Sequence, residues 1–292
     1  MVSEFELIRR HFTRPTAHTV LGVGDDAALM RIRPGMELAA STDMLVAGVH
    51  FLAGTDPRNL GWKALAVNVS DLAAMGAQPR WALLAAALPS PDEVWIAAFA
   101  EGLFACAHAH SIDIVGGDTT RGPLTINVSV FGEVPAGEAL RRSGAHAGDD
   151  IWISGTPGTA ALGLALRGLA SAAIDVSDGL LADLGHIAEC SALAAEVRDD
   201  WLPWAPLAGL TSDATLAREC LLAGGDDYEL AFTAAAGRRG EIEAAASRLG
   251  VTLTRIGRMQ GGPAGSVVLV DAGGSPLPVV ARGFDHFESA PE

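Results

Sequence analysis

The chain has 292 residues, of which 49% are hydrophobic and 5% aromatic, and its formal net charge is −15 from 20 Lys and Arg against 35 Asp and Glu. This length predicts two domains of roughly 150 residues each, and the aliphatic composition predicts an α/β or α+β architecture. The negative charge argues against nucleic acid or an anionic membrane as a partner.

The cysteines, Cys106, Cys190 and Cys220, lie far apart without a Cys-x-x-Cys pair, so neither a disulfide framework nor a zinc site is expected. The first residues lack the apolar stretch of a signal peptide, and no apolar run approaches the length of a membrane span. We therefore expect a soluble, cytoplasmic protein.

The first half of the chain alternates strand and helix patterns. Phe5, Ile8 and Phe12 recur at helical spacing and predict a short N-terminal helix. The pattern then predicts a β-rich run over 20–51, helices over 57–76 and 91–110, and strands over 81–88, 112–115 and 124–134. The polar segment 135–150 lacks apolar periodicity, so we place the domain boundary there, between residues 1–137 and residues 148–292.

The second half predicts strands over 151–154, 174–176, 228–233, 252–256 and 267–270, and a helix over 238–249. Further helices are expected after Gly155-Thr156-Pro157-Gly158 and after Ser177-Asp178-Gly179. The first of these turns lacks the Gly-Lys-Ser/Thr ending of a phosphate-binding P-loop, so a plain strand-to-helix turn is expected.

Aspartate recurs beside glycine, serine or threonine in six motifs: Gly24-Asp25-Asp26, Ser41-Thr42-Asp43, Ser70-Asp71, Gly117-Asp118-Thr119, Ser177-Asp178-Gly179 and Gly225-Asp226-Asp227. Any one of these is also typical turn or N-cap chemistry. Six together predict a carboxylate cage for a hard cation such as Mg²⁺ or Ca²⁺, because such ions prefer oxygen ligands. Chemistry on phosphate is the first hypothesis.

Repulsion among the carboxylates and a bound phosphate is a further reason to expect a divalent cation. Two carboxylates about 4 Å apart repel by roughly 4 kcal/mol at an effective dielectric near 20, and an added phosphate increases the repulsion. A divalent cation reverses the local sign. The residues alone leave His50 open between substrate contact and packing, and Arg142 open between phosphate contact and surface charge.

Read together, the motifs resemble the thiamine-monophosphate kinase family. In the first half these are Gly22-Val23-Gly24-Asp25-Asp26-Ala27, Ser41-Thr42-Asp43, Gly48-Val49-His50-Phe51, the segment 67–76 and Gly116-Gly117-Asp118-Thr119-Thr120-Arg121-Gly122. In the second half they are Arg142-Ser143-Gly144-Ala145, the segment 174–180, Gly224-Gly225-Asp226-Asp227-Tyr228-Glu229-Leu230 and Gly283-Phe284-Asp285-His286-Phe287.

The resemblance implies the two-domain α/β fold of aminoimidazole ribonucleotide synthetase, with an N-terminal sheet domain that binds metal and ATP and forms a homodimer, and a C-terminal α/β domain on the substrate side. It also implies ATP-dependent phosphorylation of thiamine monophosphate to thiamine diphosphate with several Mg²⁺ ions. Transfer is expected to be direct and in line, without a phosphoenzyme.

The resemblance assigns site residues by position. Metal ligands fall on Asp26, Ser41, Thr42, Asp43, Asp71, Asp118, Asp175 and Asp178. ATP contacts fall on Gly117, Asp118, Arg142 and Ser177, and substrate contacts on His50, Asp226 and Phe284. Catalysis is assigned to Asp43, Asp71, Asp118 and Arg142.

Two departures from the family pattern stand out. The family commonly has Glu where this chain has Asp226, and it carries an additional helical stretch between the positions of Gly163 and Ala173. Two alternatives stay open: another ATP-dependent enzyme of the same superfamily, and a non-catalytic nucleotide or divalent-cation sensor. The late first cysteine, Cys106, argues against a selenophosphate synthetase, which would place a reactive Cys near the N-terminus.

Overall fold

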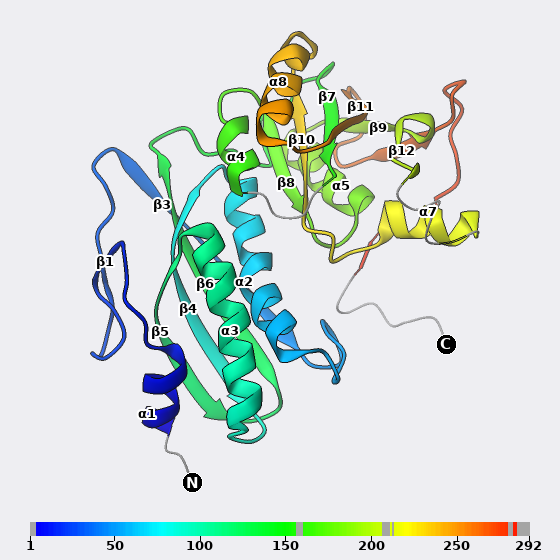
Figure 1. The fold of residues 1–292 in the computed structure, drawn as a ribbon. Helices are drawn as coiled ribbons and strands as arrows, with labels where there is room; N and C mark the ends of the chain where they lie inside the picture. The colour runs from blue at the N-terminus through cyan, green and yellow to red at the C-terminus, as the bar shows by residue number, and fades with distance from the viewer. Residues whose placement is uncertain (1–3, 156–159, 206–210, 212, 280–282, 285–292) are drawn as a thin grey trace. The chain divides into compact units, whose positions relative to one another are not determined.

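A computed structural model describes all residues except 1–3, 156–159, 206–210, 212, 280–282 and 285–292 (Figure 1). The chain forms two compact units, one of Met1–Leu72 with Ala77–Gly137 and one of Ala73–Gly76 with Glu138–Glu292. The functional division predicted between residues 1–137 and residues 148–292 stays a prediction.

The described part of the first unit contains a four-stranded sheet in the order β3-β6-β4-β5, in which only the β4–β5 pair is parallel. A separate antiparallel pair, β1–β2, precedes it. The elements are α1 (Glu4–Leu7), the π-helical turn η1 (Ile8–Phe12), β1 (Thr19–Leu21), β2 (Leu29–Met30), β3 (Met36–Val46), α2 (Pro57–Ala74), β4 (Gln78–Leu88), α3 (Glu93–His110), β5 (Asp113–Arg121) and β6 (Thr125–Pro135).

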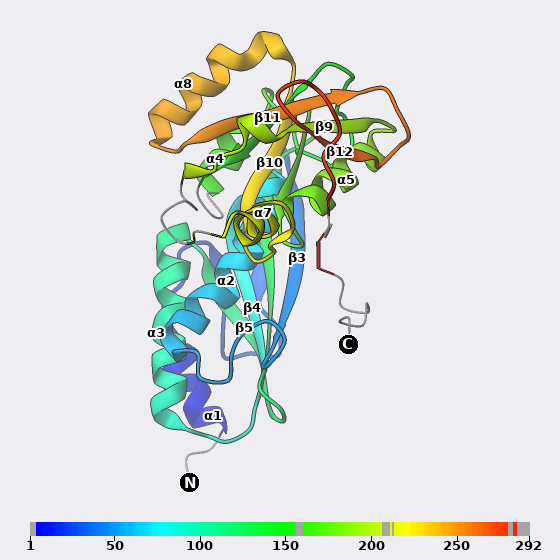
Figure 2. The same ribbon diagram turned by 90° about the vertical axis from the view of Figure 1, so that its right-hand side faces the viewer.

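Helices α2 and α3 lie side by side along one face of this sheet (Figures 1 and 2). Glycines allow their backbones to approach closely. A Cβ on Gly61 would lie 2.0 Å from the carbonyl oxygen of Phe99, and one on Gly102 would lie 1.8 Å from that of Arg58. Asp92 caps the start of α3 by accepting hydrogen bonds from the backbone of Val94 and Trp95. This packing fixes α2 against α3, and hydrogen bonds from Ser41 to Asp71 and from the backbone of Asp43 to Asn68 join α2 to β3.

The described part of the second unit contains a six-stranded sheet in the order β12-β9-β11-β7-β10-β8, in which only β12–β9 is parallel. Its elements are β7 (Asp150–Ser154), α4 (Ala160–Leu166), β8 (Ala172–Val176), α5 (Leu180–Cys190), β9 (Ala194–Arg198), η2 (Asp199–Trp201), α7 (Ala214–Ala223), β10 (Glu229–Ala234), η3 (Ala236–Arg238), α8 (Arg239–Leu249), β11 (Leu253–Gln260) and β12 (Val267–Val270). Buried aliphatic side chains of α5 and the sheet form one of its cores.

The connection from α4 to β8 is a single tight turn. The backbone N–H groups of Leu169 and Ala170 both donate to the carbonyl of Leu166 at 2.9 Å, and Gly168 adopts a left-handed conformation with φ of 71°. The segment between Gly163 and Ala173, which the sequence marks as short, is therefore closed by helix-capping hydrogen bonds. The loop 156–159 lies outside the described residues, so its predicted turn is not observed.

Within the described ranges, every helix is too short or too polar to cross a lipid bilayer.

Candidate functional site

The first group of predicted site residues lies where β3 faces α2. The hydroxyl of Ser41 donates a 2.5 Å hydrogen bond to Oδ2 of Asp71, which joins a strand residue to a helix residue thirty positions later. The backbone N–H of Asp43 donates to Oδ1 of Asn68 at 3.1 Å, and the buried Asn68 amide donates in turn to the carbonyl of Ala64. Asn68 thus fixes the backbone of Asp43, a role that sequence reasoning did not assign.

Thr42 and His50 lie close to this group along the chain. The hydroxyl of Thr42 contacts the carbonyl of Val128 at 3.1 Å and the hydroxyl of Ser129 at 3.0 Å. Nδ1 of His50 accepts a hydrogen bond from the backbone of Val46 at 3.1 Å, and Lys63 donates to the His50 carbonyl. The imidazole is therefore held in place by the turn that follows β3.

A second group lines a cavity of about 790 Å³ in the first unit. Asp26, from the turn between β1 and β2, shares this cavity with Gly117 and Asp118 of β5, and Ile8 and Phe12 of η1 form part of its apolar lining. Gly117 has φ of 149°, and a Cβ there would lie 1.7 Å from the carbonyl oxygen of Leu84. Only glycine lets β5 approach β4 this closely.

The strand order separates the two groups within one chain. Asp43 pairs with Val128, Val128 with Leu84, and Leu84 with Gly117, so Asp43 and Gly117 stand at opposite edges of the sheet in one row. Three strand spacings of about 4.8 Å place their backbones about 14 Å apart. One Mg²⁺ holds its oxygen ligands at about 2.1 Å, so Asp43 and Asp118 of one chain do not reach a common ion in this arrangement.

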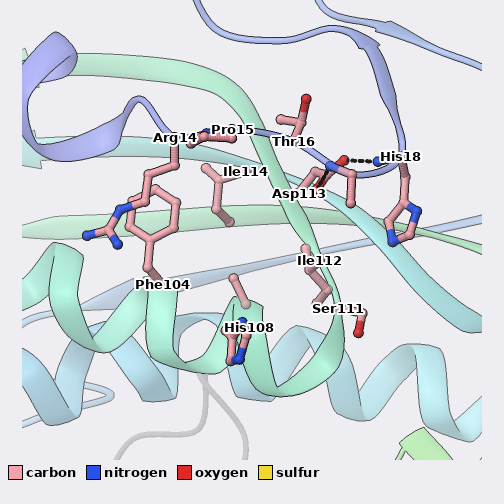
Figure 3. Close-up of a pocket in the computed structure, with 12 residues that line it drawn as sticks. Arg14, Pro15, Thr16, His18, Phe104, His108, Ser111, Ile112, Asp113 and Ile114 are labelled. Carbon is pink, nitrogen blue, oxygen red and sulfur yellow. Dashed lines mark hydrogen bonds between the residues drawn. The ribbon is translucent and has the colours of Figure 1, made fainter.

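Another cavity of the first unit, about 610 Å³, carries none of the predicted residues (Figure 3). Its contacts explain how the segment before β1 is held against β5. The buried carboxylate of Asp113, at the start of β5, accepts hydrogen bonds from the backbone of Ala17 and His18 at 2.8 and 2.6 Å and from the hydroxyl of Thr19 at 2.7 Å. Although burial alone would raise the pKa of Asp113, these hydrogen bonds lower it overall. Asp113 therefore ties the segment before β1 to the strand that carries Asp118.

In the second unit, the loop after β8 is organised by a residue that sequence reasoning did not single out. One carboxylate oxygen of Asp183, on α5, accepts hydrogen bonds from the backbone N–H groups of Ser177, Asp178 and Gly179 at 3.0, 3.1 and 3.2 Å. Burial, together with the charge of Asp178, raises the pKa of Asp183 to about 6 even though these hydrogen bonds oppose the shift. The only sequence signal is an acidic residue in the first turn of a helix.

The same loop collects two more predicted residues through backbone hydrogen bonds. The carbonyl of Ser177 accepts from the backbone N–H of Asp226 at 2.9 Å, and the carbonyl of Asp178 accepts from that of Phe284 at 2.8 Å. Phe284 is 53% exposed. Residues 285–287 of the terminal motif lie outside the described residues.

Acidic side chains gather around Asp226. Burial first, and then the charge of Asp227, raise the pKa of Glu229 to about 7, and burial together with the charge of Asp226 raises the pKa of Asp227. Such a cluster of carboxylates attracts cationic groups. Glu229 was not predicted as a site residue, although it stands in the quoted motif.

The remaining predicted residues of this unit, Asp175 and Arg142, come from β8 and from the segment before β7. Asp175 is buried and pairs with Leu230 of β10. Arg142 is exposed, and its carbonyl accepts a hydrogen bond from Ser191. Neighbouring Arg141 accepts a backbone hydrogen bond from Ala173 of β8, which fixes this segment beside the strand.

The donor set suits a hard cation. Ser41, Asp71, Asp26 and Asp118 offer hydroxyl and carboxylate oxygens, the ligands that Mg²⁺ takes, and the Ser41–Asp71 pair shows two of these donors already in contact. In the second unit, one ligand atom from each of Asp178, Asp183 and His186 lies within 4.8 Å of the others. The predicted oxygen donors of the first unit therefore fit magnesium, whereas of the second-unit cluster only Asp178 was predicted as a metal ligand.

The fold is that of an α/β protein in which β3, α2 and β5 carry carboxylate and hydroxyl oxygens. The family model for AIR synthase related protein, N-terminal domain, matches residues 24–134. The chain is 43% identical to the thiamine-monophosphate kinase of Salmonella typhimurium over an alignment that covers 97% of this chain and 98% of that protein. The chain belongs to the thiamine-monophosphate kinase family.

Solved structures agree with this relationship. The thiamine-monophosphate kinase from Stenotrophomonas maltophilia K279a is 46% identical with a TM-score of 0.81, covering 86% of this chain and 91% of that one. AaThiL complexed with AMPPCP and TMP is 27% identical with a TM-score of 0.74, covering 88% and 89%. The alignment with the Salmonella protein runs over 320 positions, more than the 292 residues here, so that relative has residues without a counterpart in this chain.

Proposed function

We propose that the chain transfers the γ-phosphoryl group of ATP to thiamine monophosphate and releases thiamine diphosphate and ADP. The observation that carries this proposal is the 43% identity to a thiamine-monophosphate kinase over nearly the whole of both chains. The complex of AaThiL with AMPPCP and TMP supports it, because AMPPCP is an ATP analogue whose terminal phosphoryl group cannot be transferred.

The cavity beside β5 is the proposed nucleotide site. Its apolar lining from Ile8 and Phe12 suits a purine base, while Gly117 and Asp118 suit the phosphate end. Gly117 lets β5 pack closely against β4, because a Cβ there would meet the carbonyl oxygen of Leu84, and this packing holds Asp118 beside the cavity. Arg142 and Ser177 of the second unit are proposed to contact ATP as well, with Arg142 steadying the triphosphate through its guanidinium.

Mg²⁺ is the proposed cofactor, held by the side chains of Asp26, Ser41, Asp43, Asp71, Asp118, Asp175 and Asp178 together with Thr42. Bound there, it neutralises the charge on the phosphate oxygens, which is the main requirement of phosphoryl transfer. Ser41 orients the carboxylate of Asp71, and Asn68 fixes the backbone of Asp43, so these ligands are positioned before substrate arrives.

The substrate needs orientation more than activation. A phosphate monoester has a second pKa of about 6, so it is already ionised near neutral pH and requires no strong base. Phe284 is proposed to pack on an aromatic ring of thiamine and Asp226 to attract its positive charge, with His50 as a further contact. The phosphate oxygen then attacks the γ-phosphorus in line, and no phosphoenzyme forms.

A homodimer would complete the metal cage. The two groups that contain Asp43 and Asp118 stand at opposite edges of the sheet, about 14 Å apart in one chain. Exposed apolar side chains at β1, β2 and β3, including Val20, Leu29 and Met44 at 54–56% exposure, offer a surface for a second copy. We propose that β3 ligands of one chain meet β5 ligands of the other.

A coupled assay of ADP release with and without thiamine monophosphate tests the reaction. Release that depends on thiamine monophosphate supports the kinase. ATP turnover that depends on a different acceptor supports another enzyme of the superfamily, and absence of release at saturating Mg²⁺ supports a nucleotide or cation sensor. The cytoplasmic location stays a prediction.

A further inference from the structure

The buried carboxylate of Asp183 lies at the centre of the loop that carries the predicted site residues Ser177 and Asp178. Asp183 is 2% exposed and occupies the first turn of α5, where its backbone N–H donates to the carbonyl of Gly179 at 3.0 Å. Its side chain turns back onto the residues that precede the helix and accepts three consecutive backbone N–H groups on one oxygen. Three converging N–H groups form an anion-binding concavity. Here the protein fills that concavity with its own carboxylate.

The opposite side of the same loop holds the other site residues. While the N–H groups of Ser177 and Asp178 point to Asp183, their carbonyl groups accept the backbone N–H groups of Asp226 and Phe284. The loop therefore connects Asp183, through backbone hydrogen bonds, to two segments that are distant in sequence.

The conformation of Asp226 depends on this arrangement. Asp226 has φ of 69°, in the left-handed region that non-glycine residues seldom adopt. Tyr228, with φ of 53°, donates its backbone N–H to the carbonyl of Val176 at 2.8 Å. Such conformations persist only where surrounding contacts determine them. Hydrogen bonds to residues 176 and 177 are among those contacts.

We infer that Asp183 is a positioning residue for the proposed phosphoryl transfer, because its carboxylate fixes the loop that presents Ser177, Asp178, Asp226 and Phe284 to the ligands. The inference rests on the proposed function for the roles of those four residues. It assigns Asp183 no contact with substrate or metal.

The test uses the full chain and three variants. Asp183→Ala removes the acceptor, while Asp183→Asn keeps an oxygen of similar position but loses the charge. Asp149→Asn is the matched control, because Asp149 is another buried aspartate of the same unit that accepts a backbone N–H, from His146 at 2.9 Å, and the hydroxyl of Ser171 at 2.5 Å.

Hydrogen–deuterium exchange of the amides of residues 177–179 tests whether Asp183 fixes the loop, without any enzyme assay. We expect about tenfold faster exchange in Asp183→Ala, a smaller increase in Asp183→Asn and none in Asp149→Asn. Steady-state kinetics test whether the position of this loop affects the proposed phosphoryl transfer. We expect kcat/KM for thiamine monophosphate to fall about tenfold or more in Asp183→Ala, with partial retention in Asp183→Asn.

Unchanged exchange at residues 177–179 in a folded Asp183 variant would overturn the inference, as would kinetic constants equal to those of Asp149→Asn. If Asp183→Ala does not fold, Asp183→Asn carries both measurements. Wild-type protein without ADP release dependent on thiamine monophosphate would instead contradict the proposed function, while the exchange experiment would still decide whether Asp183 fixes the loop.

Discussion

Ser41 of β3 and Asp71 of α2 are joined by a 2.5 Å hydrogen bond from hydroxyl to carboxylate. Two residues that the sequence places in separate motifs therefore act as one unit, in which Ser41 sets the orientation of the Asp71 carboxylate. Each of these oxygens is also a proposed donor to magnesium.

Ser41→Ala should raise the Mg²⁺ concentration needed for half-maximal activity by about tenfold, because Asp71 loses both its orienting partner and a neighbouring donor. A magnesium titration of initial rate at saturating substrates measures this. Ser90→Ala, an exposed serine of the same unit, serves as the control. Equal magnesium requirements in the two variants would remove Ser41 from the proposed site.

Asp43→Asn should abolish turnover while the fold is retained, because the amide keeps the shape of the side chain but lacks the charge that binds a divalent cation. Thermal unfolding checks that the fold is retained, and the rate of ADP release checks that turnover is abolished. Asp92→Ala provides the opposite control. It weakens the cap of α3, so it should lower the melting temperature and leave kcat unchanged. Full activity in Asp43→Asn would refute the assigned role.

Gly117→Ala should lower kcat/KM for ATP by about 100-fold, since an added Cβ would lie 1.7 Å from the carbonyl oxygen of Leu84 and must displace β5. Gly54→Ala in the same unit is the matched control, because a Cβ there meets no atom within 4 Å. An active Gly117→Ala variant with normal affinity for ATP would place the nucleotide elsewhere.

The interactions of Asp150 with three arginines predict that the stability of the folded state depends on pH. Burial alone would raise the pKa of this carboxyl, but the hydrogen bonds and charge of Arg239 and the charges of Arg255 and Arg258 lower it below 3.8. The ionised form therefore stabilises the folded state above pH 3.8, and this contribution is lost as the pH falls through the lower, folded-state pKa.

Asp150→Asn should reduce the melting temperature by about 5 °C at neutral pH, and the difference from wild type should shrink as the pH falls below 3.8. Glu241→Gln is the control, because its ion pair with Arg238 is exposed and contributes little. A difference between Asp150→Asn and wild type that stays constant from neutral pH through strong acid would show that the charge of Asp150 is not what stabilises the fold.

The sequence correctly predicted strands that are marked by short runs of apolar residues. The strands over residues 151–154 and 267–270 agree with β7 and β12, because continuous runs of apolar residues mark buried strands. It missed β9, Ala194–Arg198, where alanines replace the β-branched residues that normally mark a strand, and it also missed α7.

Contacts between residues that are distant in sequence could not be predicted from the motifs. The order of strands in a sheet follows from long-range pairing, so the separation of Asp43 from Asp118 could not be read from the chain. Likewise, the roles of Asn68 and Asp183 arise from backbone groups that converge only after folding. The proposed ligand roles themselves stay predictions until they are measured.

The most direct test of the central claim follows the transferred phosphoryl group. The chain is incubated with ATP labelled at the γ-phosphate, thiamine monophosphate and Mg²⁺, and both the product and the protein are examined for label. We predict that the label appears in thiamine diphosphate, requires Mg²⁺ and never resides covalently on the protein. Thiamine diphosphate without label, or label that passes through a protein-bound phosphate, would contradict the account.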